Sequence, residues 1–80
     1  MSSIVELAQA EVQEAQRSVS TLQTKYVSAK ALYKGNRTAT NKAARRRAKI
    51  NLRNGRKQLR RTSKKLELLE ELSRALTTPE

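Results

Sequence analysis

Arginine recurs every seven residues in the middle of this sequence, at Arg46, Arg53 and Arg60. A seven-residue step along an α-helix is about 10.5 Å, so these side chains would form a row on one side of it. A guanidinium group binds phosphate oxygens, or the edge of guanine, through two parallel hydrogen bonds. The spacing therefore indicates a phosphate-binding helical surface. Its candidate residues are Lys42, Arg45, Arg46, Arg47, Lys49, Arg53, Arg56, Lys57, Arg60, Arg61 and Lys64.

The charged residues are segregated along the chain. The 80 residues include 18 Lys and Arg but only 7 acidic residues, all of them Glu, which gives a net charge of +11. Residues 15–66 contain 17 of these cations and no acid, whereas residues 1–14 and 67–80 contain every Glu. Like charges on neighbouring helical turns repel one another. We therefore expect a polyanionic partner that offsets this repulsion.

The side chains that usually carry out catalysis are scarce. The sequence contains no Cys, His, Asp, Trp or Phe, so it lacks most residues that build metal sites and nucleophile–base pairs. The Glu residues have no His or Asp partner and are interpreted as supports for helix ends and solubility. We expect a protein that is not an enzyme, with no catalytic residue, no cofactor, no metal and no small-molecule substrate.

Small and apolar residues repeat at alternating steps of three and four in the first part of the chain, which is typical of a coiled-coil seam. This pattern predicts a helix over about residues 4–34. Ser3 and Glu6 have the spacing of a capping box at its start, and Gly35-Asn36 is expected to end it in a left-handed conformation. The seam residues are Val5, Ala8, Val12, Ala15, Val19, Leu22, Tyr26, Ala29 and Tyr33.

A second seam predicts a helix over about residues 39–76, with a turn at 35–38 and Thr38 or Thr40 as its cap. In this heptad the cations lie off the seam. The two seams together predict an all-α, coiled-coil-like antiparallel two-helix hairpin that forms a single domain over residues 1–80. The second seam consists of Ala48, Leu52, Gly55, Leu59, Thr62, Leu66, Leu69, Ser73 and Leu76.

The dipeptide Asn54-Gly55 supports an alternative fold, because Asn-Gly is a strong turn signal. A break there would give a three-helix bundle. We favour one continuous helix, since the seam crosses Gly55 in phase and a glycine inside a helix costs only about 1 kcal/mol relative to alanine.

The stretch from Asn41 to Lys49, continuing to Arg60-Arg61, resembles the arginine-rich helical motifs of phage antiterminators and viral RNA-binding proteins. The resemblance covers about 20 residues and is one of composition, without a fixed register. It implies an RNA-binding helix. The small size and basic charge are in turn typical of accessory or phage-encoded binders of RNA and DNA, and short inhibitor proteins are often encoded by phages or mobile elements.

Nucleic-acid binding through the basic face is the first functional hypothesis, with structured RNA or duplex DNA as the ligand. Tyr26 and Tyr33 are the only aromatic residues, and both fall on the seam, where core packing is the better interpretation. Single-strand binders stack bases on exposed aromatic side chains, so that class is disfavoured.

Two other kinds of partner are alternatives to nucleic acid. A small interaction or inhibitor protein could use the same cations to dock on an acidic protein surface or a ribonucleoprotein complex. Binding to a membrane surface needs a broad apolar face, whereas the narrow stripe here is used by the hairpin. Neither a signal-peptide pattern nor an apolar run approaching about 18 residues is present, so a cytoplasmic protein is expected.

Ile4, Ala75 and four leucines lie at the open end of the predicted hairpin, away from the basic segment, and all of them except Leu76 are off the seam. One interpretation is a homodimer that forms a four-helix assembly through these side chains, since small domains often gain stability by oligomerising. The other is that they complete the hairpin's own end. The predicted oligomer interface consists of Leu7, Leu68, Leu72 and Leu76.

Overall fold

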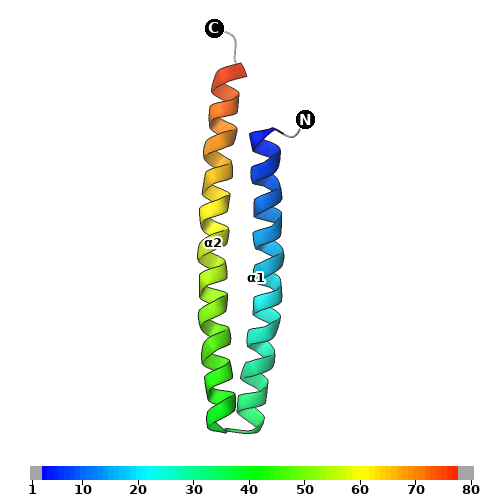
Figure 1. Ribbon diagram of the computed structural model, residues 1–80, viewed down its shortest axis with the longest axis vertical. Helices are drawn as coiled ribbons and strands as arrows, with labels where there is room; N and C mark the ends of the chain where they lie inside the picture. The colour runs from blue at the N-terminus through cyan, green and yellow to red at the C-terminus, as the bar shows by residue number, and fades with distance from the viewer. Residues whose placement is uncertain (1–2, 78–80) are drawn as a thin grey trace.

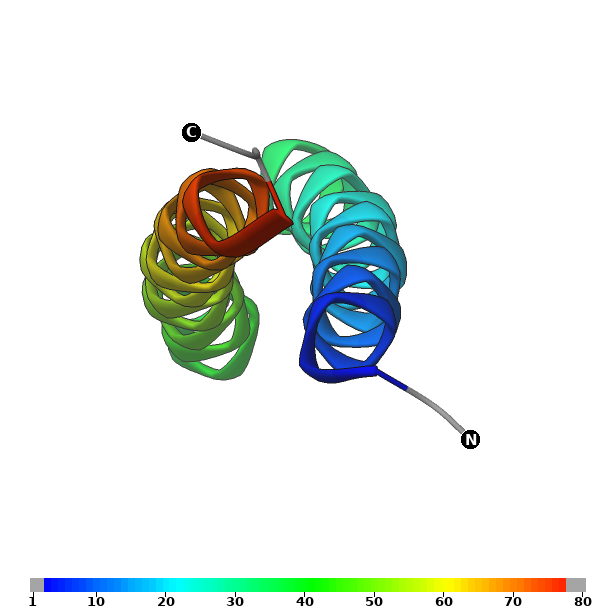
Figure 2. The same cartoon turned by 90° about the horizontal axis from the view of Figure 1, so that it is seen from above.

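The chain folds into two long helices that run antiparallel and side by side (Figure 1). A computed structural model describes residues 3–77, in which α1 spans Ile4–Gly35 and α2 spans Ala39–Thr77. Its Cα atoms extend over 65 × 19 × 12 Å, and the helices wind around each other when viewed along the rod (Figure 2). The predicted all-α hairpin is confirmed. Glu80, a member of the C-terminal acidic segment, lies outside the described residues.

The continuity of α2 excludes the three-helix alternative, because the helix passes through Asn54-Gly55 without a break. Gly55 lies at a close approach between the helices. A Cβ atom built on it would be 2.7 Å from Cδ1 of Leu22 and 3.7 Å from Cγ2 of Val19. Because Gly55 has no side chain, it leaves the space in the seam that the Leu22 side chain occupies.

The predicted seams form the contact between the helices. Every seam position of α1, and those of α2 from Ala48 to Leu69, are buried or half-buried. The most buried side chains are small or medium in size, namely Ala8, Ala15, Leu52 and Thr62. The Thr62 hydroxyl donates to the carbonyl oxygens of Gln58 and Leu59 at 3.1 and 3.0 Å, so its burial leaves its donor satisfied.

Both helices begin with a side-chain cap. Ser3 Oγ accepts a hydrogen bond from the Glu6 backbone N–H at 3.1 Å, and Thr38 Oγ1 accepts one from the Asn41 backbone N–H at 3.1 Å. Each bond satisfies an N–H group that has no partner within the helix. These contacts confirm Ser3 as the first cap and select Thr38, rather than Thr40, as the second.

The backbone conformation of the turn between the helices differs from the sequence-based prediction. Gly35 is the last residue of α1, and Asn36 is extended, with φ of −148° and ψ of 96°. No residue in the described range has a positive φ, so the expected left-handed stop is wrong. The Asn36 backbone N–H instead donates to the Leu32 carbonyl at 2.9 Å, while Nδ2 of Asn41 donates to the Asn36 carbonyl at 2.8 Å. The Asn41 side chain of α2 therefore stabilises the turn through this hydrogen bond.

Neither α1 nor α2 contains an apolar stretch long enough to span a membrane.

Candidate nucleic-acid interface

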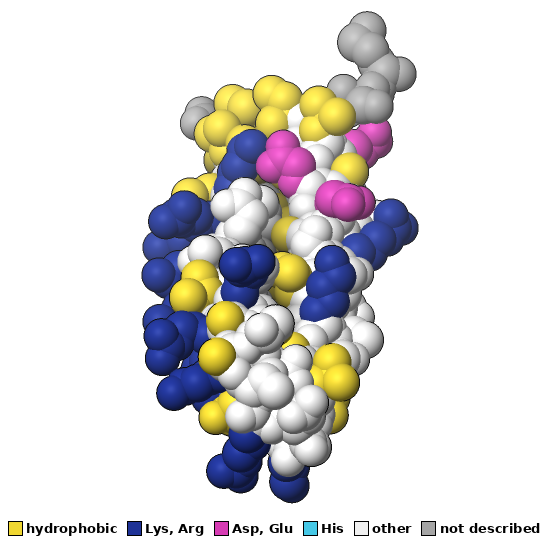
Figure 3. All heavy atoms as spheres, turned by 60° about the horizontal axis from the view of Figure 1, so that its bottom comes forward, with side chains coloured by type: hydrophobic (Ala, Val, Ile, Leu, Met, Phe, Trp, Pro, Cys, Tyr) yellow, Lys and Arg dark blue, Asp and Glu magenta, His cyan; other side chains and the backbone are white. Residues whose placement is uncertain are grey.

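Ten of the eleven predicted binding residues are exposed on α2. At about 1.5 Å per residue, the segment from Lys42 to Lys64 is about 33 Å long. Lys and Arg side chains gather along the outer side of α2 (Figure 3). We call these ten residues the basic surface: Lys42, Arg46, Arg47, Lys49, Arg53, Arg56, Lys57, Arg60, Arg61 and Lys64.

The basic surface covers the outward half of α2 rather than a single line. With about 100° of rotation per residue, Arg46, Arg53 and Arg60 share one row, and Arg47 and Arg61 lie one step further around the helix. Cations therefore point to both sides of the outer edge of α2. Such an arrangement can contact phosphates on the two walls of one groove.

One side of the basic surface borders a shallow groove between the helices. The groove has a volume of about 340 Å³ and is lined by Lys49, Arg53, Arg56 and Arg60, together with Leu52 and Tyr26. Tyr26 lies on the seam as predicted and is half-buried. Four cations around one small groove make it the part of the basic surface where several side chains can meet the same phosphate.

The basic surface has no acidic partner within residues 3–77. The Glu side chains nearest to cations are used elsewhere: Glu11 pairs with Lys65 at 3.3 Å, and Glu14 pairs with Arg17 at 3.8 Å. None of the ten side chains forms an ion pair with a Glu that the structure describes. Their positive charge is therefore available to an external anion.

Arg45 differs from the other predicted binding residues. It is half-buried on the α2 seam, three residues before Ala48, and its guanidinium carbon lies 4.7 Å from the centre of the Tyr33 ring. Arg37 approaches the same ring at 5.9 Å. The prediction that every cation lies off the seam is wrong at this position. Extending the seam one step towards the turn would have identified Arg45 as a packing residue.

Two uncharged residues, Ile50 and Asn54, are exposed among the cations of the basic surface. A prediction based on charge alone does not include them. They are four residues apart and share one face of α2, between the Arg46-Arg47 and Arg60-Arg61 pairs. Ile50 is 49% exposed, although its neighbours Arg46, Asn54 and Lys57 on this face are polar. In a major groove, Asn binds the adenine edge and an apolar side chain contacts the thymine methyl group. The available sequence signal was that Ile50 is the one large apolar residue off the seam between Lys42 and Lys64.

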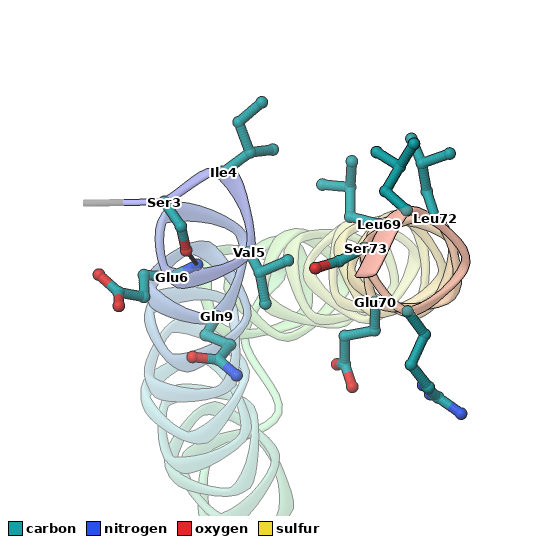
Figure 4. Close-up of a pocket in the computed structure, with 11 residues that line it drawn as sticks. Ser3, Ile4, Val5, Glu6, Gln9, Leu69, Glu70, Leu72 and Ser73 are labelled. Atoms are coloured by element: carbon teal, nitrogen blue, oxygen red, sulfur yellow. Dashed lines mark hydrogen bonds between the residues drawn. The ribbon is translucent and has the colours of Figure 1, made fainter. Parts of the chain in front are cut away.

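The four predicted interface leucines belong to the helix ends that form the open end of the hairpin, and they are 56–78% exposed. Ile4, at the start of α1, is exposed to a similar degree. A groove of about 740 Å³ separates the two helices there, with Val5 on one wall and Leu69 on the other (Figure 4). The open end thus carries no part of the basic surface.

No group of three or more His, Cys, Asp or Glu side chains that could hold a metal ion occurs in the described part of the chain. Comparisons with protein-family models, with curated proteins and with solved structures find no match to this chain.

Proposed function

We propose that this protein is a non-enzymatic nucleic-acid-binding hairpin whose basic surface contacts the phosphate backbone of duplex DNA or structured RNA. The observation that carries the proposal is the presence of ten exposed cations on one helix with no described acidic partner. Phosphate neutralisation releases condensed counterions, and this release supplies most of the affinity of such surfaces.

The dimensions of the hairpin favour contact through the outer edge of α2. A B-DNA major groove is about 12 Å wide and accepts one helix, and a turn of duplex is about 34 Å long, close to the length of the basic surface. The Cα atoms of the hairpin extend 19 Å across its broader side, so both helices cannot enter together. In this mode α1 remains outside and holds α2 in position. An RNA major groove accepts the same edge only where a bulge or loop widens it.

Packing against α1 also preorganises the basic surface. Because α2 is already folded, its ten cations are held in register before binding, and little backbone order has to be gained in the complex. This arrangement distinguishes the hairpin from an arginine-rich peptide that folds only on its ligand.

The test is fluorescence anisotropy with three labelled ligands: a duplex DNA of about 20 base pairs, a bulged RNA hairpin and a single-stranded DNA. With at least six phosphate contacts, affinity for the preferred structured ligand should fall about 10³-fold between 50 and 200 mM salt. The comparison of DNA with RNA then identifies the ligand.

A pair of triple variants separates a defined surface from general charge. Replacing Arg46, Arg53 and Arg60 by Gln should weaken binding and reduce the slope of log affinity against log salt by about 3 units. The control replaces Arg17, Lys25 and Lys34 by Gln, which removes the same charge from α1 and should change the slope much less. Equal losses in both variants would contradict the assignment of the interface to α2.

Weak, salt-insensitive binding to all three ligands would reject the nucleic-acid proposal as a whole. An acidic protein surface or a ribonucleoprotein complex would then become the better candidate partner for the same cations.

A further inference from the structure

The seam of α2 continues beyond the start of α1. Figure 1 shows the C-terminal end of α2 projecting past the first turn of α1. Leu69 is half-buried, whereas the next two seam positions, Ser73 and Leu76, are exposed, and Leu76 is 78% exposed. A coiled-coil seam buries its side chains against a facing helix. Leu76, the last seam position of α2, has the spacing for such a contact but stays largely exposed in the described part of the chain.

Other large aliphatic side chains lie near the exposed Leu76 at this end of the hairpin. We call the group the leucine patch, and Figure 4 shows its members Ile4 and Leu72 pointing to the same side of the open end as Leu69, away from Glu6 and Glu70. Exposed apolar side chains gathered in one place mark interaction sites more often than isolated ones do. The leucine patch consists of Ile4, Leu7, Leu68, Leu72 and Leu76.

The charge distribution indicates which partner fits the patch. Two copies of a chain with a net charge of +11 repel one another wherever their basic surfaces meet. Glu6 and Glu70 line the groove at the open end and Glu67 and Glu71 lie nearby on α2, and these acids disfavour a nucleic acid or an anionic lipid as the occupant. Contact between two open ends keeps the basic surfaces as far apart as the 65 Å rods allow.

We propose that two copies of this chain associate through their leucine patches to form a two-fold symmetric dimer. In such an isologous contact the same patch meets itself, so the apolar end of each α2 packs against that of the other and covers its Leu76. The turn of each hairpin then points away from the dimer axis.

The dimer has a consequence that rests on the proposed function. Two basic surfaces carried by one particle, at opposite ends, bind two separate segments of nucleic acid and hold them together. The protein would therefore bridge nucleic-acid segments as well as bind them.

Sedimentation velocity over a range of protein concentrations tests the dimer without any ligand. The full chain should sediment as a dimer, and Leu72→Glu should raise the dissociation constant of the dimer by a factor of ten or more, because it places a carboxylate in the apolar contact. The matched control is Leu32→Glu, which changes a leucine that is 63% exposed near the turn, and it should remain dimeric. Circular dichroism establishes that both variants stay helical.

Two results would overturn the dimer. One is a strict monomer at several hundred micromolar wild-type protein. The other is an equal loss of dimer in the Leu72→Glu and Leu32→Glu variants, which would assign the effect to charge alone. If the wild-type protein is a strict monomer, a different protein becomes the candidate partner of the leucine patch.

A bridging assay tests the consequence, with one duplex fixed to beads and a second, fluorescent duplex in solution. Wild-type protein and Leu32→Glu should retain the fluorescent duplex, whereas Leu72→Glu should bind single short duplexes normally and retain several-fold less. If no variant binds duplex while sedimentation still shows a dimer, the proposed function fails and the self-association stands. If wild-type protein is dimeric and binds duplex without retaining the second one, the bridging inference is wrong.

Discussion

At the scale of single residues, the contact between Gly55 and Leu22 determines how closely the helices pack. Alanine at position 55 would gain about 1 kcal/mol of helix propensity. Its Cβ would lie 2.7 Å from Cδ1 of Leu22, so that side chain must move, and overpacking of this kind typically costs about 1–3 kcal/mol. We therefore expect Gly55→Ala alone to be neutral or destabilising.

A double-mutant cycle isolates this contact. Leu22→Val removes Cδ1, so Gly55→Ala should stabilise the protein by about 1 kcal/mol in that background, which gives a coupling energy of about 1 kcal/mol or more. The measurement is urea unfolding at one fixed protein concentration, because self-association would make the unfolding free energy depend on concentration. Strictly additive effects of the two substitutions would show that the contact is not tight.

Residue spacing alone assigned most side chains correctly, and the exceptions have physical reasons. Alternating steps of three and four identified every seam position of α1, because that periodicity fixes which side chains share a helix face. The charge of Arg45 alone predicts a phosphate-binding residue, whereas its position on the seam predicts packing between the helices. Its aliphatic stem and planar head also suit packing on the Tyr33 ring, a role that charge counting does not reveal.

At the scale of the helices, the first turn of α2 combines a good cap with an unfavourable charge. Thr38 supplies the cap, yet the first turn contains no acid, and Lys42 follows closely after it. A negative charge near a helix N-terminus is stabilising by about 0.3–1 kcal/mol. Thr38→Asp keeps an oxygen that can accept from Asn41 and adds that charge, so it should stabilise the protein, whereas Thr38→Ala should destabilise it by about 1 kcal/mol.

Thr40→Asp is the control that separates the effect of an added negative charge from the effect of the cap at position 38. It adds the same charge to the first turn but leaves the Thr38 cap unchanged, so it reports the charge effect alone. Urea unfolding should rank Thr38→Asp above wild type and Thr38→Ala below it. If Thr38→Ala equals wild type, the hydrogen bond to Asn41 contributes nothing to stability.

The helices themselves were predictable, whereas their ends and relative register were less so. Continuity through Gly55 followed from the phase of the seam. The extended conformation of Asn36 did not, because it depends on the Asn41 side chain, which reaches back from the next helix. The exposure of Ser73 and Leu76 likewise depends on where α1 begins opposite α2, and each seam taken alone carries no information about that register. Whether the basic surface binds nucleic acid stays a prediction.

At the scale of the whole molecule, the charge that suits an anionic ligand should destabilise the free protein. Within α2, Arg53, Lys57 and Arg61 follow one another at four-residue steps, and like charges at this spacing cost about 0.2–0.5 kcal/mol per pair. The pairs lie at the surface, where salt screens them: the Debye length falls from about 30 Å at 0.01 M salt to about 10 Å at 0.1 M. The free hairpin should therefore become more stable as salt increases.

Thermal unfolding of the free protein checks this expectation. Raising sodium chloride from 0.01 to 1 M should raise the Tm by several degrees, since 1 kcal/mol corresponds to about 4–8 °C for a domain of this size. The Arg46, Arg53 and Arg60 to Gln variant should start with a higher Tm at low salt and approach the wild-type value at high salt. Over the same range, nucleic-acid binding should weaken, because the salt that screens repulsion within α2 also competes for the phosphates. Parallel salt responses in wild type and variant would show that repulsion on α2 does not limit stability, and the like-charged helix would then need no anion to offset it.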